Sequence, residues 1–424
     1  MRLINRPDKQ EPKETQINDP ELIKAHGYVA ETHQICTQDD YYLTVHRVLS
    51  SNDRVPLNAD SIINTDITVI ENKSSKDRNS SVSPDCRILE TLGCTSSSSK
   101  LPIIISHGIL SSSADWVLLG PQKALPYILC DNGFDVWLTN ARGNTYSRSH
   151  KYYSIKDKEF WNFSWHEIGY YDLPATIDYI LEKTGYSKLY YIGYSQGTTA
   201  FYVMGSERPE YNAKIKGMIS LAPTVFMGNQ RSPIFKITAP ICNVLVKGSY
   251  ICNINQFFPR NKWQSLVLKT LVNKAPRPVT MGFCYCWFFL IAGFNSDQLD
   301  KSMLPLIFEH SPAGSSVKQL HHFNQIIKTG SFQKFDYGTE VNLTFYGSIQ
   351  APKYTLERVK VPVAIFYSDN DFLTHHTDVQ KLVDNLPNVI QTEKIEKFNH
   401  IDYLWGRDAK TILYNSILAV LEKF

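Results

Sequence analysis

The stretch Leu189-Tyr190-Tyr191-Ile192-Gly193-Tyr194-Ser195-Gln196-Gly197-Thr198 decides the fold of this chain. Its first four residues form an apolar run with aromatic and β-branched side chains, which predicts a buried strand. Residues 198–204 predict a helix. A serine on a sharp strand-to-helix turn has a strained backbone and an exposed hydroxyl, and flanking glycines let neighbouring backbone approach. The pattern therefore predicts a nucleophilic serine, Ser195.

Similar apolar runs predict further strands. They lie at residues 103–105, 134–138, 217–221 and 363–367. Continuous runs of this length are typical of strands buried on both faces of a sheet. Helical segments such as residues 171–183 lie between them, and this alternation predicts an α/β protein with a doubly wound, mostly parallel sheet.

The first half of the chain combines this core with polar segments. Residues 1–20 are polar and charged and predict a disordered N-terminal arm. Residues 21–222 predict the first part of the core, beginning with a strand hairpin over 27–49. Residues of about 50–100 are rich in Ser, Asn and Asp, which predicts a flexible insertion.

The second half contains a long interruption of the strand–helix pattern. About 130 residues separate Pro223 from Pro352, far too many for one crossover helix. Residues 223–352 therefore predict an inserted, mostly helical cap over the carboxyl edge of the sheet, where ligands bind in open α/β folds. Residues 353–424 complete the core.

Serine is a weak nucleophile, so Ser195 requires a base and an acid that orients the base. In this kind of fold they follow the serine in the order acid, then histidine. The last histidine is His400, and the loop after the 363–367 strand contains Asp369 and Asp371. His400 is the candidate base, and we favour Asp371 over Asp369 as the acid, partly because of the family resemblance described below.

Other candidates fit less well. Asp402 is too close to His400 in the sequence to orient its imidazole, and His375 and His376 follow Asp371 too closely to reach back across it. His321 and His322 fall in the cap, where packing or solvent exposure is expected.

The reaction also requires two backbone N–H groups that stabilise the oxyanion. One is expected from Gln196, directly after the nucleophile. The other is expected from Ile109, because Ser106-His107-Gly108-Ile109-Leu110 follows the 103–105 strand and Gly108 permits a tight turn. We interpret His107 as a structural residue that holds this loop.

Composition excludes several other classes. The formal net charge of +3 favours neither nucleic acid nor an acidic tail, and the longest apolar run, residues 284–294, is too short to span a bilayer. The eight cysteines lie at irregular spacings without paired metal motifs, and Cys284 and Cys286 are expected to pack in the interior. Cys242 and Cys252 are spaced for a short disulfide loop, a pairing that spacing alone leaves open.

Several motifs together resemble the acid lipase family, which includes lysosomal acid lipase, gastric lipase and related steryl ester hydrolases. The resemblance extends from about Pro20 to the C-terminus and rests on these segments: His107-Gly108-Ile109-Leu110 with Ser112, Ser113, Ala114, Asp115 and Trp116; Asn140-Ala141-Arg142-Gly143-Asn144-Thr145-Tyr146-Ser147-Arg148-Ser149-His150; Tyr171-Asp172-Leu173-Pro174-Ala175; Gly193-Tyr194-Ser195-Gln196-Gly197-Thr198; His310-Ser311-Pro312-Ala313-Gly314-Ser315-Ser316; and Asn399-His400-Ile401-Asp402-Tyr403.

The resemblance implies an α/β-hydrolase fold and hydrolysis of triacylglycerols or cholesteryl esters without a cofactor or metal. It implies that Ser195 is the nucleophile, Asp371 the acid and His400 the base, with the amides of Ile109 and Gln196 binding the oxyanion. The chain departs from the family at Ile109, where leucine is usual, and at Ala292, where cysteine is frequent, so a family-like cap disulfide is not expected.

Two alternatives to a lipase remain at this point: a carboxylesterase for short soluble esters, and a lipid-binding protein without catalysis. The intact residues Ser195, Asp371 and His400 argue against the latter.

Location rests on two opposing observations. The family and the N-x-S/T sequons imply a lysosomal or secreted glycoprotein, whereas residues 1–16 contain no apolar stretch typical of a signal peptide. The sequons lie at Asn72, Asn79, Asn162 and Asn342.

Overall fold

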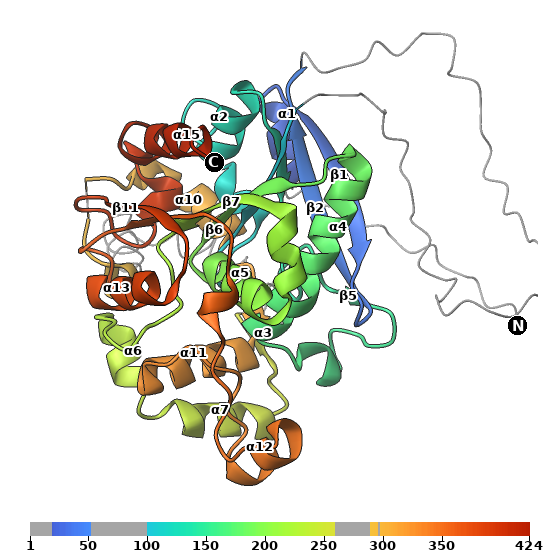
Figure 1. Ribbon diagram of the computed structural model, residues 1–424, viewed down its shortest axis with the longest axis vertical. Coiled ribbons are helices and arrows are strands. Elements are labelled where there is room, and N and C mark those ends of the chain that lie inside the picture. The colour runs from blue at the N-terminus through green and yellow to red at the C-terminus, as the bar shows by residue number, and fades with distance from the viewer. Residues whose placement is uncertain (1–18, 52–99, 259–288, 296) are drawn as a thin grey trace, which may run out of the picture.

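The computed structural model describes residues 19–51, 100–258, 289–295 and 297–424. A nine-stranded sheet forms its centre, in the order β1-β2-β4-β3-β6-β7-β10-β11, with β5 paired to β2 (Figure 1). The strands are β1 (Val29–Cys36), β2 (Tyr41–Leu49), β3 (Pro102–Ser106), β4 (Asp135–Leu138), β5 (Ser149–His150), β6 (Leu189–Tyr194), β7 (Ile215–Leu221), β10 (Val363–Tyr367) and β11 (Val389–Lys394).

The central strands are parallel and buried. From β4 to β11 all neighbours run parallel, and every residue of β3, β4 and β6 is buried. β1 and β2 form the expected hairpin, with Val29 opposite Leu49, and β2 pairs antiparallel with β4. The predicted strands and the mostly parallel, doubly wound sheet are confirmed, because apolar runs without alternation have both faces covered.

Helices cover both faces of the sheet and give each face its own hydrophobic core. One face packs against α1 (Asp19–Ala25), α2 (Leu125–Asp131), α10 (Leu304–His310), α14 (Asp402–Trp405) and α15 (Asn415–Leu421). The other packs against α4 (Leu173–Thr184), α5 (Gln196–Glu207), α11 (Val317–Thr329) and α13 (His376–Asn385), with short α3 (Trp165–Glu167) and the π-helical turn η5 (Ile168–Asp172) beside them.

The described part of the interval between β7 and β10 is mainly helical. Besides α10 and α11 it contains α6 (Pro233–Thr238), α7 (Cys242–Ile251), α12 (Thr339–Tyr346) and a two-stranded pairing of β8 (Gln256–Phe257) with β9 (Ser315–Ser316). Helices α6, α7, α11 and α12 gather at one end of the molecule, whereas α10 lies near α15 (Figure 1). The division of the chain at residues 222 and 352 stays a prediction.

Two expectations change at the level of detail. Helix α1 begins at Asp19, whose side chain is buried, so the N-terminal arm expected over 1–20 is ordered at its last two residues. Cys242 and Cys252 lie at the two ends of α7 and are not bonded to each other. A helix rises about 1.5 Å per residue, which separates them too far for a disulfide.

Other expectations lie partly or wholly outside the described residues. These are most of the 50–100 insertion with Asn72 and Asn79, the cysteines Cys284 and Cys286, and the first part of the apolar run at 284–294.

Glycines allow the turn after β6 to pack closely against β3. A Cβ atom on Gly197 would lie 2.7 Å from the backbone oxygen of Ser106, and one on Gly193 would lie 2.9 Å from the backbone of Gly197 and Thr198. These distances are too short for any side chain, so the predicted role of the flanking glycines is confirmed.

We predict that Gly197→Ala lowers the free energy of unfolding by about 3 kcal/mol, because the new methyl group meets backbone that cannot move aside. The measurement is urea unfolding followed by circular dichroism. Gly248→Ala is the matched control: its Cβ would meet nothing within 4 Å, so this helical site should gain about 0.5–1 kcal/mol. Equal stability of Gly197→Ala and the parent would contradict the prediction.

Candidate active site

The three residues predicted for acyl transfer lie at the carboxyl ends of strands in one half of the sheet. Ser195 joins β6 to α5, Asp371 lies in the loop after β10, and His400 lies in the loop between β11 and α14. Strands β6, β7, β10 and β11 are consecutive neighbours in the sheet. The parallel topology therefore brings together residues that are up to 205 positions apart in the sequence.

These side chains form one hydrogen-bonded chain. The Nδ1–H of His400 donates to Oδ2 of Asp371 at 2.7 Å, and the Ser195 hydroxyl donates to Nε2 of His400 at 2.9 Å. All three residues are buried. The second oxygen of Asp371 accepts from the backbone N–H groups of Leu373 and Thr374 at 2.8 and 3.0 Å, which fixes the carboxylate. The arrangement can remove a proton from the serine and hold the resulting imidazolium.

The other candidate carboxylates make different contacts. Asp369 is half exposed and pairs with Lys394 at 3.1 Å. Asp402 accepts from the backbone N–H of Asn399 and from Asn295, both at 2.8 Å, and burial raises the pKa of Asp402 to about 7. Neither carboxylate contacts His400.

The other candidate histidines lie away from Ser195. His375 and His376 begin α13, where His376 is exposed. His322 is buried and stacks on Trp165 with ring centroids 3.6 Å apart, so it serves packing. His321 lies partly exposed beside Asn243.

The backbone of Ser195 adopts the strained conformation that the motif predicts. Its φ is 51° and its ψ is −120°, a region that costs of order 1–3 kcal/mol for a non-glycine residue. The Ser195 N–H donates to Leu221 O of β7 at 3.0 Å, and its carbonyl accepts from Thr198 N at 2.9 Å. The neighbouring strand and the first turn of α5 thus hold the strained residue in place.

The expected oxyanion loop lies directly against the serine. A Cβ atom on Gly108 would lie 3.2 Å from Cβ of Ser195 and 3.0 Å from the ring of Tyr194, so any larger residue would have to displace these neighbours. Gln196 is the first residue of α5, where a backbone N–H has no partner within the helix. Within the described part of the chain, the N–H of Ile109 also lacks a hydrogen-bond acceptor.

His107 holds this loop rather than facing the serine. Its Nδ1–H donates to Gly108 O at 2.7 Å, and its Nε2 accepts from the backbone N–H of Ala141 at 3.1 Å. Burial lowers the pKa of His107 to about 4, so it is neutral at pH 7. The partners of Nε2 lie in the Asn140–His150 motif, where Asn144 also contacts it at 3.2 Å.

Sequence reasoning missed two contacts that join the loops. The carbonyl of Ala292 accepts from the backbone N–H of both Phe372 and His400, at 3.2 and 3.0 Å. The hydroxyl of Tyr194 donates to the carbonyl of His400 at 2.6 Å. Any residue has a backbone carbonyl, so the sequence does not mark the one of Ala292. A tyrosine beside the nucleophile is expected to pack in the core. Neither contact could therefore be predicted from the sequence.

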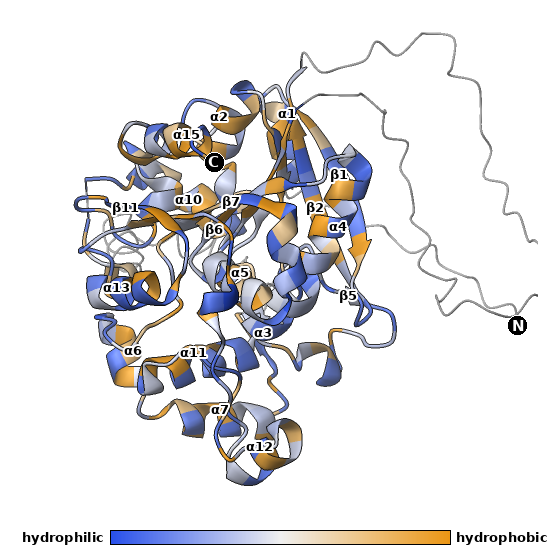
Figure 2. Cartoon of the chain, viewed as in Figure 1, coloured by the Kyte–Doolittle hydropathy of each residue, from blue (hydrophilic) through white to orange (hydrophobic). Residues whose placement is uncertain are grey.

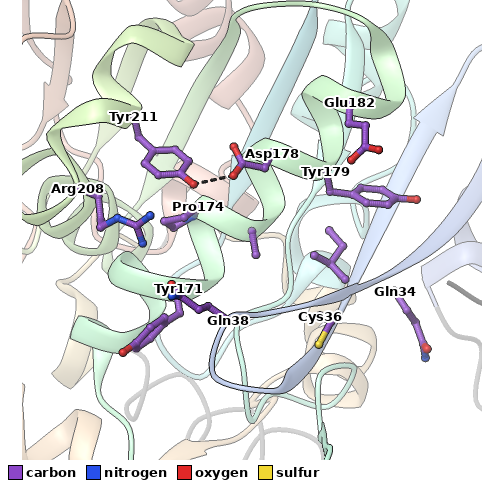
Figure 3. Close-up of a pocket in the computed structure, with 12 residues that line it drawn as sticks. Gln34, Cys36, Gln38, Tyr171, Pro174, Asp178, Tyr179, Glu182, Arg208 and Tyr211 are labelled. Carbon is purple, nitrogen blue, oxygen red and sulfur yellow. Dashed lines mark hydrogen bonds between the residues drawn. The ribbon is translucent and has the colours of Figure 1, made fainter. Parts of the chain in front are cut away.

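A separate groove of about 460 Å³ opens between β1, α4 and the segment after α5. Figure 3 shows Tyr211 donating to Asp178 across one side of it, with Arg208 and Tyr171 nearby. None of the predicted site residues lines this groove. In the described ranges, no group of three or more His, Cys, Asp or Glu side chains is arranged to hold a metal ion. No helix in those ranges is long and apolar enough to cross a membrane.

Comparison with known proteins places the chain among lipases. Residues 102–238 match the alpha/beta hydrolase fold family, and residues 20–120 match the partial alpha/beta-hydrolase lipase region. A solved structure from Sulfolobus solfataricus aligns with a TM-score of 0.56 over 94% of this chain and 95% of its own, at 14% identity, which supports the fold alone.

Relatives in sequence cover nearly the whole chain. Lipase 3 of Drosophila melanogaster is 40% identical over 95% of this chain and 92% of its own. The lysosomal acid lipase/cholesteryl ester hydrolase of Macaca fascicularis is 33% identical, and the gastric triacylglycerol lipase of Homo sapiens is 32% identical, each over 97% of this chain and 92% of its own. The buried Ser–His–Asp arrangement and these similarities together make the chain a member of the acid lipase family of α/β-hydrolases.

Proposed function

We propose that this protein hydrolyses carboxylic esters of neutral lipids, triacylglycerols or cholesteryl esters, through an acyl-enzyme intermediate. The observation that carries the proposal is the hydrogen-bonded chain from Asp371 through His400 to Ser195. The names of relatives that are 32–33% identical, which describe triacylglycerol and cholesteryl ester hydrolysis, support the substrate class.

Each proposed residue has one role. His400 Nε2 takes the proton of Ser195 as the serine oxygen attacks the ester carbonyl carbon, and Asp371 stabilises the imidazolium. The N–H groups of Ile109 and Gln196 bind the oxyanion. His400 then protonates the departing alcohol, leaving an acyl-serine. A water molecule, deprotonated by His400, releases the fatty acid and restores Ser195.

The surface of α7 supports a substrate at a lipid–water interface. Val244, Leu245 and Ile251 are 72, 55 and 85% exposed, and Figure 2 shows hydrophobic residues on both α7 and α12. An exposed apolar surface of this kind is unfavourable in water and favourable against acyl chains. It gives the enzyme a means of contacting an insoluble ester.

We predict that Ser195→Ala reduces hydrolysis of emulsified triolein and cholesteryl oleate by at least ~10⁴-fold, because the nucleophile is lost. Assays at roughly pH 5 and 7.5, either side of an ordinary histidine pKa, should include p-nitrophenyl butyrate as a short soluble ester. The control is Ser206→Ala, another buried serine, whose oxygen accepts from Thr355 N at 2.7 Å.

Three results would contradict the proposal in different ways. Retained activity in Ser195→Ala would reject the mechanism. Turnover of the short ester alone would make the protein a carboxylesterase, and lipid binding without any turnover would make it a carrier.

A second prediction distinguishes the two carboxylates. Asp371→Asn should lower kcat by about 10⁴-fold, because an amide favours the wrong tautomer of His400. Asp369→Asn should change kcat by less than about twofold, since Asp369 is half exposed and pairs with Lys394. Steady-state kinetics with p-nitrophenyl butyrate measures both, and a large loss in Asp369→Asn alone would exchange their roles.

We further propose a lysosomal or extracellular location, on the strength of the relatives' names and of the sequon at Asn162. Asn162 is exposed. Asn342 is 1% exposed, and its Nδ2 donates to Asp336 and to Ile349 O, at 2.7 and 3.2 Å, which leaves no hydrogen for a glycan bond.

Glycosidase treatment of the protein from a secretory host tests this location. We predict a mobility shift on treatment that is reduced in Asn162→Gln and unchanged in Thr344→Ala, which removes the sequon of Asn342 without altering its amide contacts. A protein from its natural source that carries no glycan and remains in the cytosolic supernatant on cell fractionation would reject the location.

A further inference from the structure

Asp115 is a buried carboxylate that accepts hydrogen bonds from two serines. It lies in the short 3₁₀ turn η3 (Ser113–Trp116) and is 1% exposed. The Ser111 hydroxyl donates to its Oδ2 at 2.5 Å, and the Ser311 hydroxyl donates to Oδ2 at 2.8 Å. In the part of the chain that the structure describes, no Lys, Arg or His side chain pairs with it. Burial raises the pKa of Asp115 to about 6.

These hydrogen bonds join three segments that meet at the candidate active site. Ser111 ends the oxyanion loop, two residues after Ile109, and Ser311 belongs to the segment between α10 and β9. The indole N–H of Trp405, five residues after His400, donates to the carbonyl of Asp115 at 3.2 Å. Asp115 therefore connects the oxyanion loop both to the interval between β7 and β10 and to the histidine segment.

A second link anchors the same part of the loop. The backbone N–H of Ala313 donates to the carbonyl of Leu110 at 2.6 Å, and Leu110 has a positive φ of 60°. The loop is thus held on both sides of Ile109. Before it, Gly108 packs against Tyr194. After it, Leu110 bonds to Ala313 and Ser111 bonds to Asp115. These anchors define the direction of the Ile109 peptide.

The two hydrogen bonds from Ser111 and Ser311 explain why a carboxylic acid occupies position 115. Two serine hydroxyls can donate at the same time only to a group with several free lone pairs, and a carboxylate has about four. Without that acceptor both hydroxyls would be buried and unpaired, which favours movement of the loop toward water. A positively charged side chain beside Asp115 would compete with the two serine hydroxyls for its oxygen atoms.

We propose that Asp115 is a positioning residue that, through Ser111 and Ser311, aims the Ile109 N–H at the developing oxyanion. The inference rests on the proposed function, because it assigns a cause to the oxyanion geometry that the reaction requires. Asp115 itself contacts neither Ser195 nor His400 and acts only through the loop.

The test measures kcat and KM for p-nitrophenyl butyrate, with active sites counted by complete labelling with a fluorophosphonate. Counting sites removes the effect of any unfolded fraction. We expect Asp115→Ala to lower kcat per labelled site about tenfold or more, with KM changed less than about threefold, because a misdirected oxyanion donor acts on the transition state. Asp115→Asn, which keeps one acceptor and offers a donor to the other serine, should recover kcat to within about threefold of the parent.

Two results with labelled protein would overturn the inference. One is a kcat for Asp115→Ala within about twofold of the parent, and the other is an equal loss in Asp115→Asn and Asp115→Ala. If Asp115→Ala yields no protein that can be labelled, Ser311→Ala decides, with Ser206→Ala as its control. Ser311→Ala should lose kcat by about threefold or more, and a kcat equal to that of the control would overturn the inference.

The same assay separates this inference from the proposed function. A parent protein that cannot turn over any ester would remove both. A parent whose activity depends on Ser195 but not on Asp115 would remove only the positioning role.

Discussion

The left-handed backbone of Ser195 is the constraint on which the surrounding structure depends. A φ of 51° costs of order 1–3 kcal/mol, and the residue keeps it because β7 and the first turn of α5 bond its N–H and carbonyl. The turn also requires that no side chain lie between it and β3: a Cβ atom on Gly197 would lie 2.7 Å from the Ser106 carbonyl oxygen. The strained backbone turns the Ser195 hydroxyl toward His400. The hydrogen bonds to β7 and α5 offset the free energy of the strain.

The buried guanidinium of Arg142, in the segment that supports the oxyanion loop, is paired with two carboxylates. Arg142 is 1% exposed and donates to both Asp39 and Asp172, at 2.8 Å each, while its guanidinium lies 4.0 Å from the centre of the Tyr41 ring. Removing one partner of such a buried ion pair leaves an uncompensated charge, which strongly destabilises the fold. The segment from Asn140 to His150 therefore acts as a rigid support for His107 and the oxyanion loop.

The interval between β7 and β10 contributes to the site through its backbone and one serine side chain. The carbonyl of Ala292 accepts from the loops that contain Asp371 and His400, and the N–H of Ala313 donates to Leu110, next to Ile109. The Ser311 hydroxyl donates to Asp115, which in turn accepts from Ser111. Hydrogen bonds from this interval thus help to fix the relative positions of the loops that contain Asp371, His400 and Ile109.

The sequence by itself determined the strands, the strand-to-helix turn at Ser195 and the order of the candidate residues, because apolar runs, glycine and a fixed motif order are local signals. It also favoured Asp371 over Asp369, although that preference came partly from family resemblance. Only the tertiary structure decided which carboxylate bonds His400, since two aspartates two positions apart differ in burial and not in local pattern. The same holds for Asp115 and for the carbonyl of Ala292. Asp115 and its partner Ser311 are 196 positions apart in the sequence. Such contacts exist only after the sheet brings distant loops to one edge.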